Sequence, residues 1–306
     1  MDRRTFFRNG LKASAVVGSY VAFGKYARAF ELPPSGASSF DLVAIKGGEP
    51  EVMFDRGIEA LGGMKAFVKK GAKVVVKPNI GWDVSPERAG NTHPKLVARI
   101  IEHCFNAGAK DVYVFDHTCD KWQRCYSTSG IEAAAKGAGA KVVSGDSEGY
   151  YHDVAIPQGR GITKAKEHEL LLESDVFINV PVLKDHGGSR MTMSMKNLMG
   201  VVWDRGMWHR TDLHQCIADF ATYRKPTLNV LDAYNVMKRN GPRGVSVEDV
   251  VCMKAQLLST DMVTIDAAGA KLYGMDPQDV RHIVLAAEMK AGRMDLEKLN
   301  IKRISI

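Results

Sequence analysis

Short apolar runs alternate with amphipathic segments along most of this chain, and this alternation restricts the folds it can adopt. Residues 73–77 read KVVVK, a run typical of a strand buried on both faces of a parallel sheet. The pattern predicts strands at residues 40–46, 73–77, 111–115, 141–143, 175–180, 227–231 and 253–258. It predicts helices at residues 51–61, 94–106, 130–137, 262–273 and 279–287.

Strands separated by helices of about ten or more residues favour βαβ units with parallel pairing. We therefore expect an α/β fold, with a mostly parallel sheet flanked by helices. It would form one large domain, or two lobes with a cleft at the carboxyl ends of the strands. Ligands bind at that edge in open α/β sheets.

Ionisable and amide side chains follow directly after several predicted strands, where a ligand would bind. They include Lys77, Asn79, His117, Lys184 and Asp232. These residue types can bind a substrate or transfer protons. A structural role is equally open for Lys77 and Asn79 as turn residues beside a proline, and for Asp232 as a helix cap or turn support.

Residues 184–214 hold the densest group of ionisable side chains, including His186, Lys196, His209 and His214. A desolvated lysine becomes a nucleophile or covalent anchor, and a histidine can take and return a proton near neutral pH. Lys196 suits the binding of a phosphate or carboxylate equally well, and His186 suits a capped turn. Imidazoles also bind Zn, Cu, Fe or Ni, although His209 and His214 lack an HxxxH-type spacing.

Two apolar segments predict packing rather than chemistry. As a helix, residues 191–198 would place Met191, Met195 and Leu198 on one face, which favours core packing over a soft-metal site. Asp266 lies inside the predicted helix 262–273, where a buried carboxylate needs a partner, and we expect a structural one.

The N-terminal segment has the layout of an export signal. Residues 2–8 read DRRTFFR, an apolar run follows at 13–23, and residues 27–29 read ARA. We interpret residues 1–29 as a twin-arginine signal peptide, with a basic amphipathic helix as the alternative, residues 30–39 as a linker and residues 40–306 as the α/β domain. We expect export to the periplasm by the twin-arginine translocase and membrane contact only through an uncleaved signal. That route carries folded proteins, which favours a cofactor loaded before export.

The charge of the chain belongs largely to this segment. The formal net charge is +7, and residues 1–29 hold six basic residues and one acidic residue. The remainder therefore has 36 basic and 34 acidic residues, which gives no support for nucleic-acid binding.

Five cysteines place few constraints on the fold. Their number is odd, and there is no CxxC pair or ferredoxin-type run, so an iron–sulfur cluster has little support. Cys119 and Cys125 lie six residues apart in a polar stretch, where a disulfide and two free thiols are both open.

An ordered set of motifs resembles the domain of unknown function 362 family. The set comprises residues 75–79 (VVKPN), 91–94 (NTHP), 108–116, 175–186, 194–200 (SMKNLMG), 240–242 (NGP) and 259–267. The resemblance covers most of residues 40–290 and implies site roles for Thr92, His93 and Asn197. Many members carry a twin-arginine signal, and many carry an iron–sulfur segment that has no counterpart in this sequence.

A more distant resemblance is to the N-terminal domain of the nickel-pincer lactate racemases. Those enzymes hold a pincer cofactor on a lysine, with one histidine on nickel and others moving protons. The resemblance implies that His117 and His186 are acid/base residues and that Lys196 is the cofactor lysine. It further implies that His209 or His214 ligates the metal, while His93 replaces an arginine of the substrate-binding turn.

We therefore expect an exported enzyme that uses a transition metal or metal–organic cofactor on a small anionic substrate. Its chemistry would be that of an oxidoreductase or an isomerase or racemase. The alternative is an accessory protein that presents a ligand, metal or iron–sulfur cluster to a redox partner. Convergence of His117, His186 and Lys196 in one cleft favours the enzyme. An exposed apolar patch of Trp203, Met207 and Trp208 favours the accessory protein.

Overall fold

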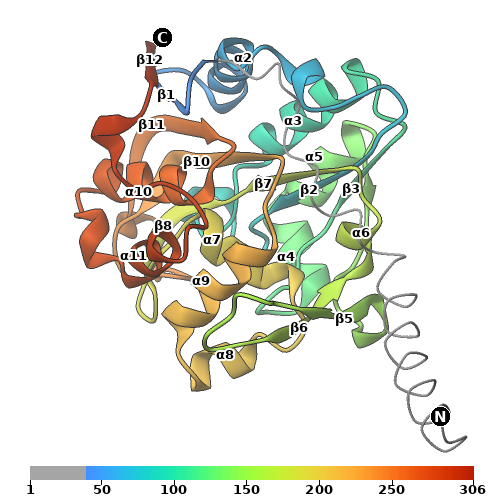
Figure 1. The fold of residues 1–306 in the computed structure, drawn as a ribbon. Coiled ribbons are helices and arrows are strands. Elements are labelled where there is room, and N and C mark those ends of the chain that lie inside the picture. The colour runs from blue at the N-terminus through green and yellow to red at the C-terminus, as the bar shows by residue number, and fades with distance from the viewer. Residues whose placement is uncertain (1–38) are drawn as a thin grey trace, which may run out of the picture. The chain divides into compact units, whose positions relative to one another are not determined.

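A ten-stranded sheet runs through the computed structural model, which describes residues 39–306 (Figure 1). Its strands are β1 (Leu42–Lys46), β2 (Lys73–Pro78), β3 (Asp111–Val114), β4 (Lys141–Val142), β7 (Val176–Val180), β8 (Val182–His186), β9 (Arg190–Thr192), β10 (Leu228–Met237), β11 (Val250–Ser259) and β12 (Ile301–Ser305). The main order is β12-β1-β11-β10-β7-β2-β3-β4, while β8 pairs with β10 and β9. The predicted signal peptide, and the predicted linker except for its last residue, lie outside the described residues.

Parallel pairing dominates this sheet. Strands β10, β7, β2, β3 and β4 form a continuous parallel series, and β12 is parallel to β1. The predicted α/β fold with a mostly parallel sheet is thus confirmed. Strand β11 is the exception, because it pairs antiparallel with both β1 and β10. It returns from β10 through residues 238–249, which include no crossover α-helix of the kind that usually joins parallel strands.

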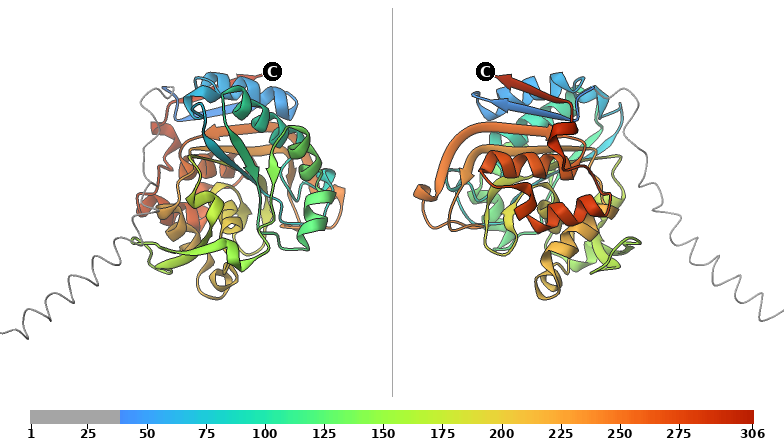
Figure 2. Two further views of the ribbon diagram at one scale, coloured as in Figure 1. Left: turned by 90° about the vertical axis from the view of Figure 1, so that its right-hand side faces the viewer. Right: turned by 60° about the vertical axis from the view of Figure 1, so that its left-hand side comes forward.

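Helices cover both faces of the sheet (Figure 2). One face carries α2 (Pro50–Ala60), α3 (Pro94–Asn106), α4 (Trp122–Thr128) and α5 (Ile131–Gly137), and the other carries α7 (Ser194–Asn197), α9 (Leu213–Tyr223), α10 (Met262–Tyr273) and α11 (Arg281–Glu288). Separate hydrophobic cores fill the two faces, with Phe54 and Ile100 in one and Phe220 and Ile265 in the other. The described residues form one compact unit rather than two lobes.

The remaining elements are short and lie at the margin of the sheet. Strands β5 (Tyr151–Ala155) and β6 (Lys164–His168) form a separate antiparallel hairpin, and α6 (Glu169–Leu172) and α8 (Gly206–Arg210) are single turns. None of the helices in residues 39–306 is long and apolar enough to span a membrane.

The helix predicted at residues 191–198 is wrong in its first half. Residues Arg190–Thr192 form β9, which pairs antiparallel with β8, and the helical turn begins only at Ser194. Met191 and Met195 are nevertheless both buried, as core packing requires. Pairing with β8 satisfies the backbone of residues 190–192, so this segment gains nothing from a helical start.

Candidate functional site

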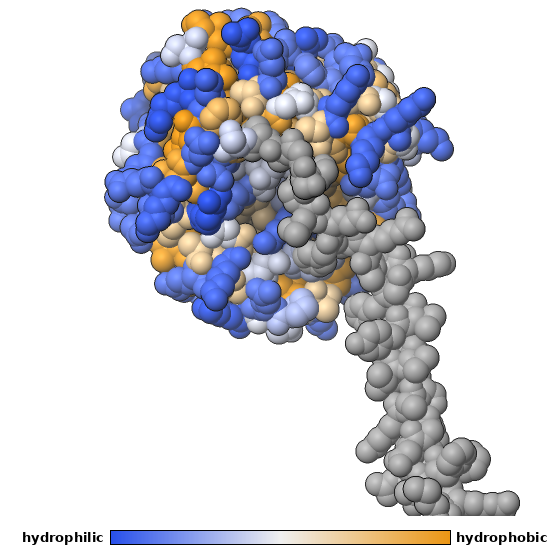
Figure 3. Space-filling view, turned by 45° about the horizontal axis from the view of Figure 1, so that its top comes forward, coloured by the Kyte–Doolittle hydropathy of each residue, from blue (hydrophilic) through white to orange (hydrophobic). Residues whose placement is uncertain are grey.

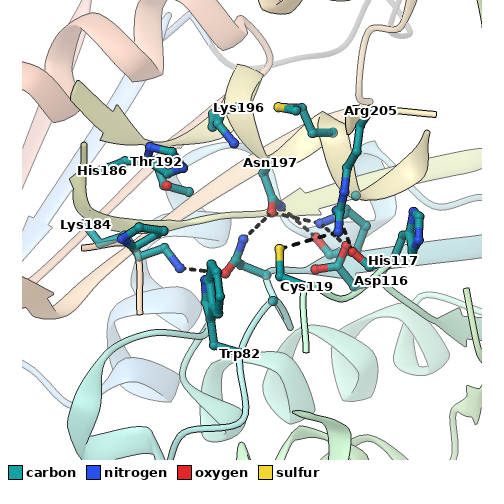
Figure 4. A pocket seen from close by; sticks show the side chains of 16 residues that line it. Trp82, Asp116, His117, Cys119, Lys184, His186, Thr192, Lys196, Asn197 and Arg205 are labelled. Carbon is teal, nitrogen blue, oxygen red and sulfur yellow. Dashed lines mark hydrogen bonds and ion pairs between the residues drawn. The ribbon is translucent and has the colours of Figure 1, made fainter. Parts of the chain in front are cut away.

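A small pocket opens at the carboxyl ends of β2 and β3, beside β8 and α7 (Figure 4). Its cavity measures about 50 Å³. Several predicted site residues line it together, namely Lys77, Asn79, His117, Lys184, His186, Lys196 and Asn197. Residues that the sequence reasoning did not single out also line it, among them Trp82, Asp116, Cys119, Thr192 and Arg205. The candidate catalytic residues His117, after β3, His186, at the end of β8, and Lys196, on α7, therefore line one cleft.

A buried ion pair forms the floor of the pocket. Lys77 Nζ lies 2.9 Å from Asp116 Oδ1, and both side chains are almost fully buried. Lys77 Nζ also donates to Asn197 Oδ1 and to the Pro78 carbonyl, each at 2.8 Å. Burial lowers the pKa of Lys77, and the charge of Asp116 opposes that shift. Lys77 therefore has its charge and its donors satisfied within the protein, which favours a structural role over direct substrate binding.

Gly200 makes this pair possible. A Cβ atom at this position would lie 1.8 Å from Asp116 Oδ1 and 2.7 Å from Lys77 Nζ. The backbone of the 3-10 turn Leu198–Val201 thus runs directly against the two charged groups. Only a glycine leaves room for them.

A network of side-chain amides positions α7 over the sheet. Asn197 Nδ2 donates to Asn179 Oδ1 at 2.8 Å, and Asn179 Nδ2 donates to Ser194 Oγ at 2.9 Å. All three side chains are buried. The amide of Asn197 is thus bonded to Lys77 and to the strand beneath it, and its predicted role in substrate binding stays a prediction.

Asp266 fixes the start of the same helix. This fully buried carboxylate on α10 accepts from Ser194 N at 2.7 Å and from Met195 N at 3.0 Å. Burial raises its pKa to about 7. The expected structural partner of Asp266 is thus the N-terminus of α7, which carries Lys196 toward the pocket.

Lys184 and Lys196 place two amines in the cavity. Lys184 Nζ donates to Asn79 Oδ1 at 3.1 Å and to the Gly90 carbonyl at 2.5 Å. Lys196 is half-buried, and no hydrogen bond or ion pair joins its Nζ to another described residue. Burial lowers the pKa of Lys184 to about 7, and burial together with the charge of Arg205 lowers that of Lys196 to about 8. Both amines therefore gain from a bound negative charge.

Arg205 adds a fourth cation, after Lys77, Lys184 and Lys196, and sequence patterns did not predict it. Its guanidinium donates to the carbonyls of His117 (2.6 Å) and Thr118 (2.7 Å) and to Cys119 Sγ (3.5 Å). These contacts tie the loop after β3 to the segment before α8. No local pattern around Arg205 distinguishes it from other surface arginines, so only the tertiary structure identifies it.

The two candidate acid/base histidines, in their neutral form, carry the proton on different ring nitrogens. His117 Nδ1 faces the Val202 carbonyl at 3.1 Å, and a carbonyl only accepts, so the neutral ring has Nδ1–H and an unprotonated Nε2. His186 Nδ1 accepts from Gly188 N (3.1 Å) and Ser189 N (3.2 Å), so its neutral ring has Nε2–H. Burial, aided by nearby cations, lowers the pKa of both, to about 3 for His186. His117 can thus accept a proton, while His186 is a neutral donor.

The two predicted metal ligands lie beside different histidines. The His209 ring stacks 6.5 Å from that of His186, whereas His214 Nδ1 lies 3.2 Å from Nδ1 of the buried His282. Within residues 39–306 there is no group of three or more His, Cys, Asp or Glu side chains that could hold a metal ion. The donor set therefore does not fit a metal bound by protein side chains alone.

Thr92, His93 and Asp232 lie outside the lining of the pocket. Asp232 is buried and accepts from His93 N at 2.7 Å, and Thr92 Oγ1 donates to the Val180 carbonyl at 2.7 Å. His93 caps α3 by accepting from Lys95 N at 3.3 Å. These contacts join the start of α3 to the sheet, which explains the three residues without a ligand.

The cysteines carry no cross-link in the part of the chain that the structure describes. Cys119 is an exposed free thiol at the pocket rim, and Cys125 is buried on α4. The two thiols are therefore separate, and the alternative of two free thiols holds.

Fold and pocket together define a class of protein. It is an α/β protein with a cationic cleft at the carboxyl ends of its parallel strands, the usual ligand-binding edge of such sheets. The chain belongs to the family described as Domain of unknown function (DUF362), whose model matches residues 74–271.

Individual relatives extend this comparison. A thylakoid-associated protein of Synechocystis is 26% identical over 257 residues, which cover 77% of this chain and 73% of that protein. Among solved structures, the lactate racemase apoprotein of Thermoanaerobacterium thermosaccharolyticum matches with a TM-score of 0.43 and 15% identity. A Thermotoga maritima protein matches with a TM-score of 0.45 and 11% identity. These two matches cover 74% and 79% of this chain, and the chain spans only 55% and 60% of the matched structures.

Proposed function

We propose that the protein is an enzyme that binds a small anionic carbon acid and moves a proton on the carbon next to its acidic group. The observation that carries this proposal is one pocket combining unpaired cations with a histidine base and a histidine donor. Lys184, Lys196 and Arg205 lack a carboxylate partner among the described residues, so a bound anion would complete their charge.

The two histidines divide the work of proton transfer. His117 Nε2 would take the proton from the substrate carbon, and the resulting negative charge would pass to an oxygen of the substrate. His186 Nε2–H and the Lys196 ammonium would donate hydrogen bonds to that oxygen. Return of the proton from His117 to a different atom of the substrate would complete an isomerisation, whereas return to the same carbon after exchange with solvent would replace its hydrogen. In Figure 4, His117 and His186 lie at opposite ends of the pocket with Asn197 between them.

A cofactor enters this proposal only as an alternative role of Lys196. An organic cofactor attached covalently to its amine would supply an electron sink for the same reaction, and Lys196 would then no longer act as an ammonium donor. No step is assigned to a metal, since the donor set of the described residues does not hold one. The intact mass of the purified protein tests for a group attached to Lys196, and its metal content tests whether a metal is bound.

The accessory-protein alternative has less support. Trp208 is fully buried, and Trp203 and Met207 are half-buried, so the expected exposed apolar patch does not form. On the face drawn in Figure 3, hydrophilic side chains surround several smaller hydrophobic areas.

Export by the twin-arginine translocase is part of our proposal and rests on residues 1–29 alone. Cell fractionation of the wild type and an Arg3→Lys/Arg4→Lys variant tests it.

Deuterium exchange tests the proposed chemistry. Small 2-hydroxy carboxylates are incubated with the protein in D₂O, and loss of the signal from the C–H next to the carboxylate is followed by proton NMR. His117→Gln should slow exchange by about 100-fold or more, the usual contribution of a general base. His152→Gln, at an exposed histidine outside the pocket, is the control and should keep the wild-type rate. Equal rates in all three proteins would disprove the role of His117.

A further inference from the structure

The pocket holds more positive charge than its own residues neutralise. Asp116 balances Lys77, and in the described residues it is the only carboxylate that lines the cavity. Among residues 39–306, Lys184 and Arg205 bond only to neutral oxygens and a thiol, and Lys196 has no hydrogen-bond or ion-pair partner. A buried charge without a partner is costly, so each of these cations favours an anion beside it.

The uncompensated cations lie at different ends of the cavity. Figure 4 shows Lys184 beside His186 at one end and Arg205 beside His117 at the other, with Lys196 nearer to His186. Burial is the main cause of the lowered pKa of both histidines; the charge of Lys196 adds to it at His186, and the charge of Arg205 adds to it at His117. A ligand with one negative group could satisfy only one end.

Donors are available at both ends. A guanidinium has five N–H bonds, of which Arg205 commits three, and an ammonium has three, of which Lys184 commits two. Lys196 commits none. His186 adds its Nε2–H, because two backbone N–H groups occupy the other nitrogen of the ring. The pocket thus offers donors at both ends, where a ligand rich in oxygen acceptors would bind.

We propose that the natural ligand is a short dianion with its two negative groups on separate atoms, one at Arg205 and the other between Lys184 and Lys196. This inference rests on the proposed function and names its substrate class, a dicarboxylate or a carboxylate with a second acidic group. A cavity of about 50 Å³ restricts the ligand to a few carbon atoms. The carbon between its two acidic groups would then lie between His117 and His186.

Calorimetry with simple anions tests this inference. The full-length protein is titrated with malonate, succinate, acetate and phosphate at about pH 6.5 and constant ionic strength. Malonate or succinate should bind about tenfold or more tightly than acetate, because a second charge pair forms in a poorly solvated site. Arg205→Gln and Lys196→Met should each reduce this preference to about twofold or less. Arg210→Gln, at an exposed arginine outside the pocket, is the control.

Each possible result of the calorimetry leads to a different conclusion. A dicarboxylate preference that both variants lose supports the dianion. If Arg205→Gln does not fold, because its bonds to the loop after β3 are gone, Lys196→Met alone decides. Equal affinity for acetate and the dicarboxylates overturns the dianion and leaves the anion site standing. Phosphate binding as tight as that of malonate shows that the two charges need not be separate, which also overturns the proposal. If no anion binds in a way that depends on Lys196, the proposed function fails as well.

Discussion

Replacing Gly200 by alanine should destabilise the protein, because the added methyl group would clash with one buried ion pair. The added Cβ would lie 1.8 Å from Asp116 Oδ1 and 2.7 Å from Lys77 Nζ, distances that only a displacement of the ion pair can relieve. Neither partner can turn to solvent, because Lys77 is 0% and Asp116 2% exposed. Separating a buried ion pair costs about 3–5 kcal/mol, so we expect a loss of that size in the free energy of unfolding.

Urea unfolding followed by tryptophan fluorescence measures this loss by linear extrapolation. Gly187→Ala is a matched control, since a Cβ at this exposed position meets no atom within 4 Å. Neither glycine has a positive φ, so backbone strain does not distinguish the two substitutions. The control should change the free energy of unfolding by about 0.5 kcal/mol or less. A loss below about 1 kcal/mol in Gly200→Ala would refute the close packing of the ion pair against this backbone.

Three further predictions concern the same pocket. Because burial lowers the pKa of Lys184 to about 7 and of Lys196 to about 8, both lose charge as the pH rises from about 6 to about 9. Anion affinity by calorimetry should therefore fall across that range, and a constant affinity would contradict the charge assignment. Asp266→Asn removes one acceptor from the start of α7 and should cost about 1–3 kcal/mol in urea unfolding; a loss no larger than that of Asp153→Asn, at an exposed aspartate, would argue against the cap. Nitrogen-15 NMR should find His186 neutral, with its proton on Nε2, at about pH 5, and a charged ring at that pH would disprove the assignment.

Local patterns predicted the elements whose signals are complete within a few residues. Helix α3 has its proline start, its apolar stripe and its glycine end within one segment, and its predicted bounds agree with the structure. Strand β2 likewise follows its apolar run. The β9 strand and the antiparallel direction of β11 were missed although β8 and β10 precede them directly, because residues 190–192 are too few to show a strand pattern and an apolar run does not report the direction of its pairing.

For the site as well, the sequence predicted where residues lie along the sheet but not where their side chains point. Ionisable residues after β2, β3 and β7 were correctly expected at one edge of the sheet, and several of them meet in the pocket. Asp232 follows a predicted strand too, but β10 continues to Met237, so Asp232 lies within the strand and its carboxylate accepts from His93 N. Strand ends thus locate the edge but do not give the direction of each side chain. Arg205 enters the pocket from a separate segment, which is why sequence reasoning missed it.

The pairing of β1 means that the sheet can be completed only late in the synthesis of this protein. β1 holds residues 42–46, whereas its two neighbours are β11, at residues 250–259, and β12, at residues 301–305. A ribosome delivers residues from the N-terminus at about 5–20 per second, so β1 waits more than ten seconds for its partners. Throughout this interval its apolar LVAI segment has an unpaired edge on both sides. A chaperone acting during translation would therefore have a target in this strand, and the sheet can close only after β12 has left the ribosome.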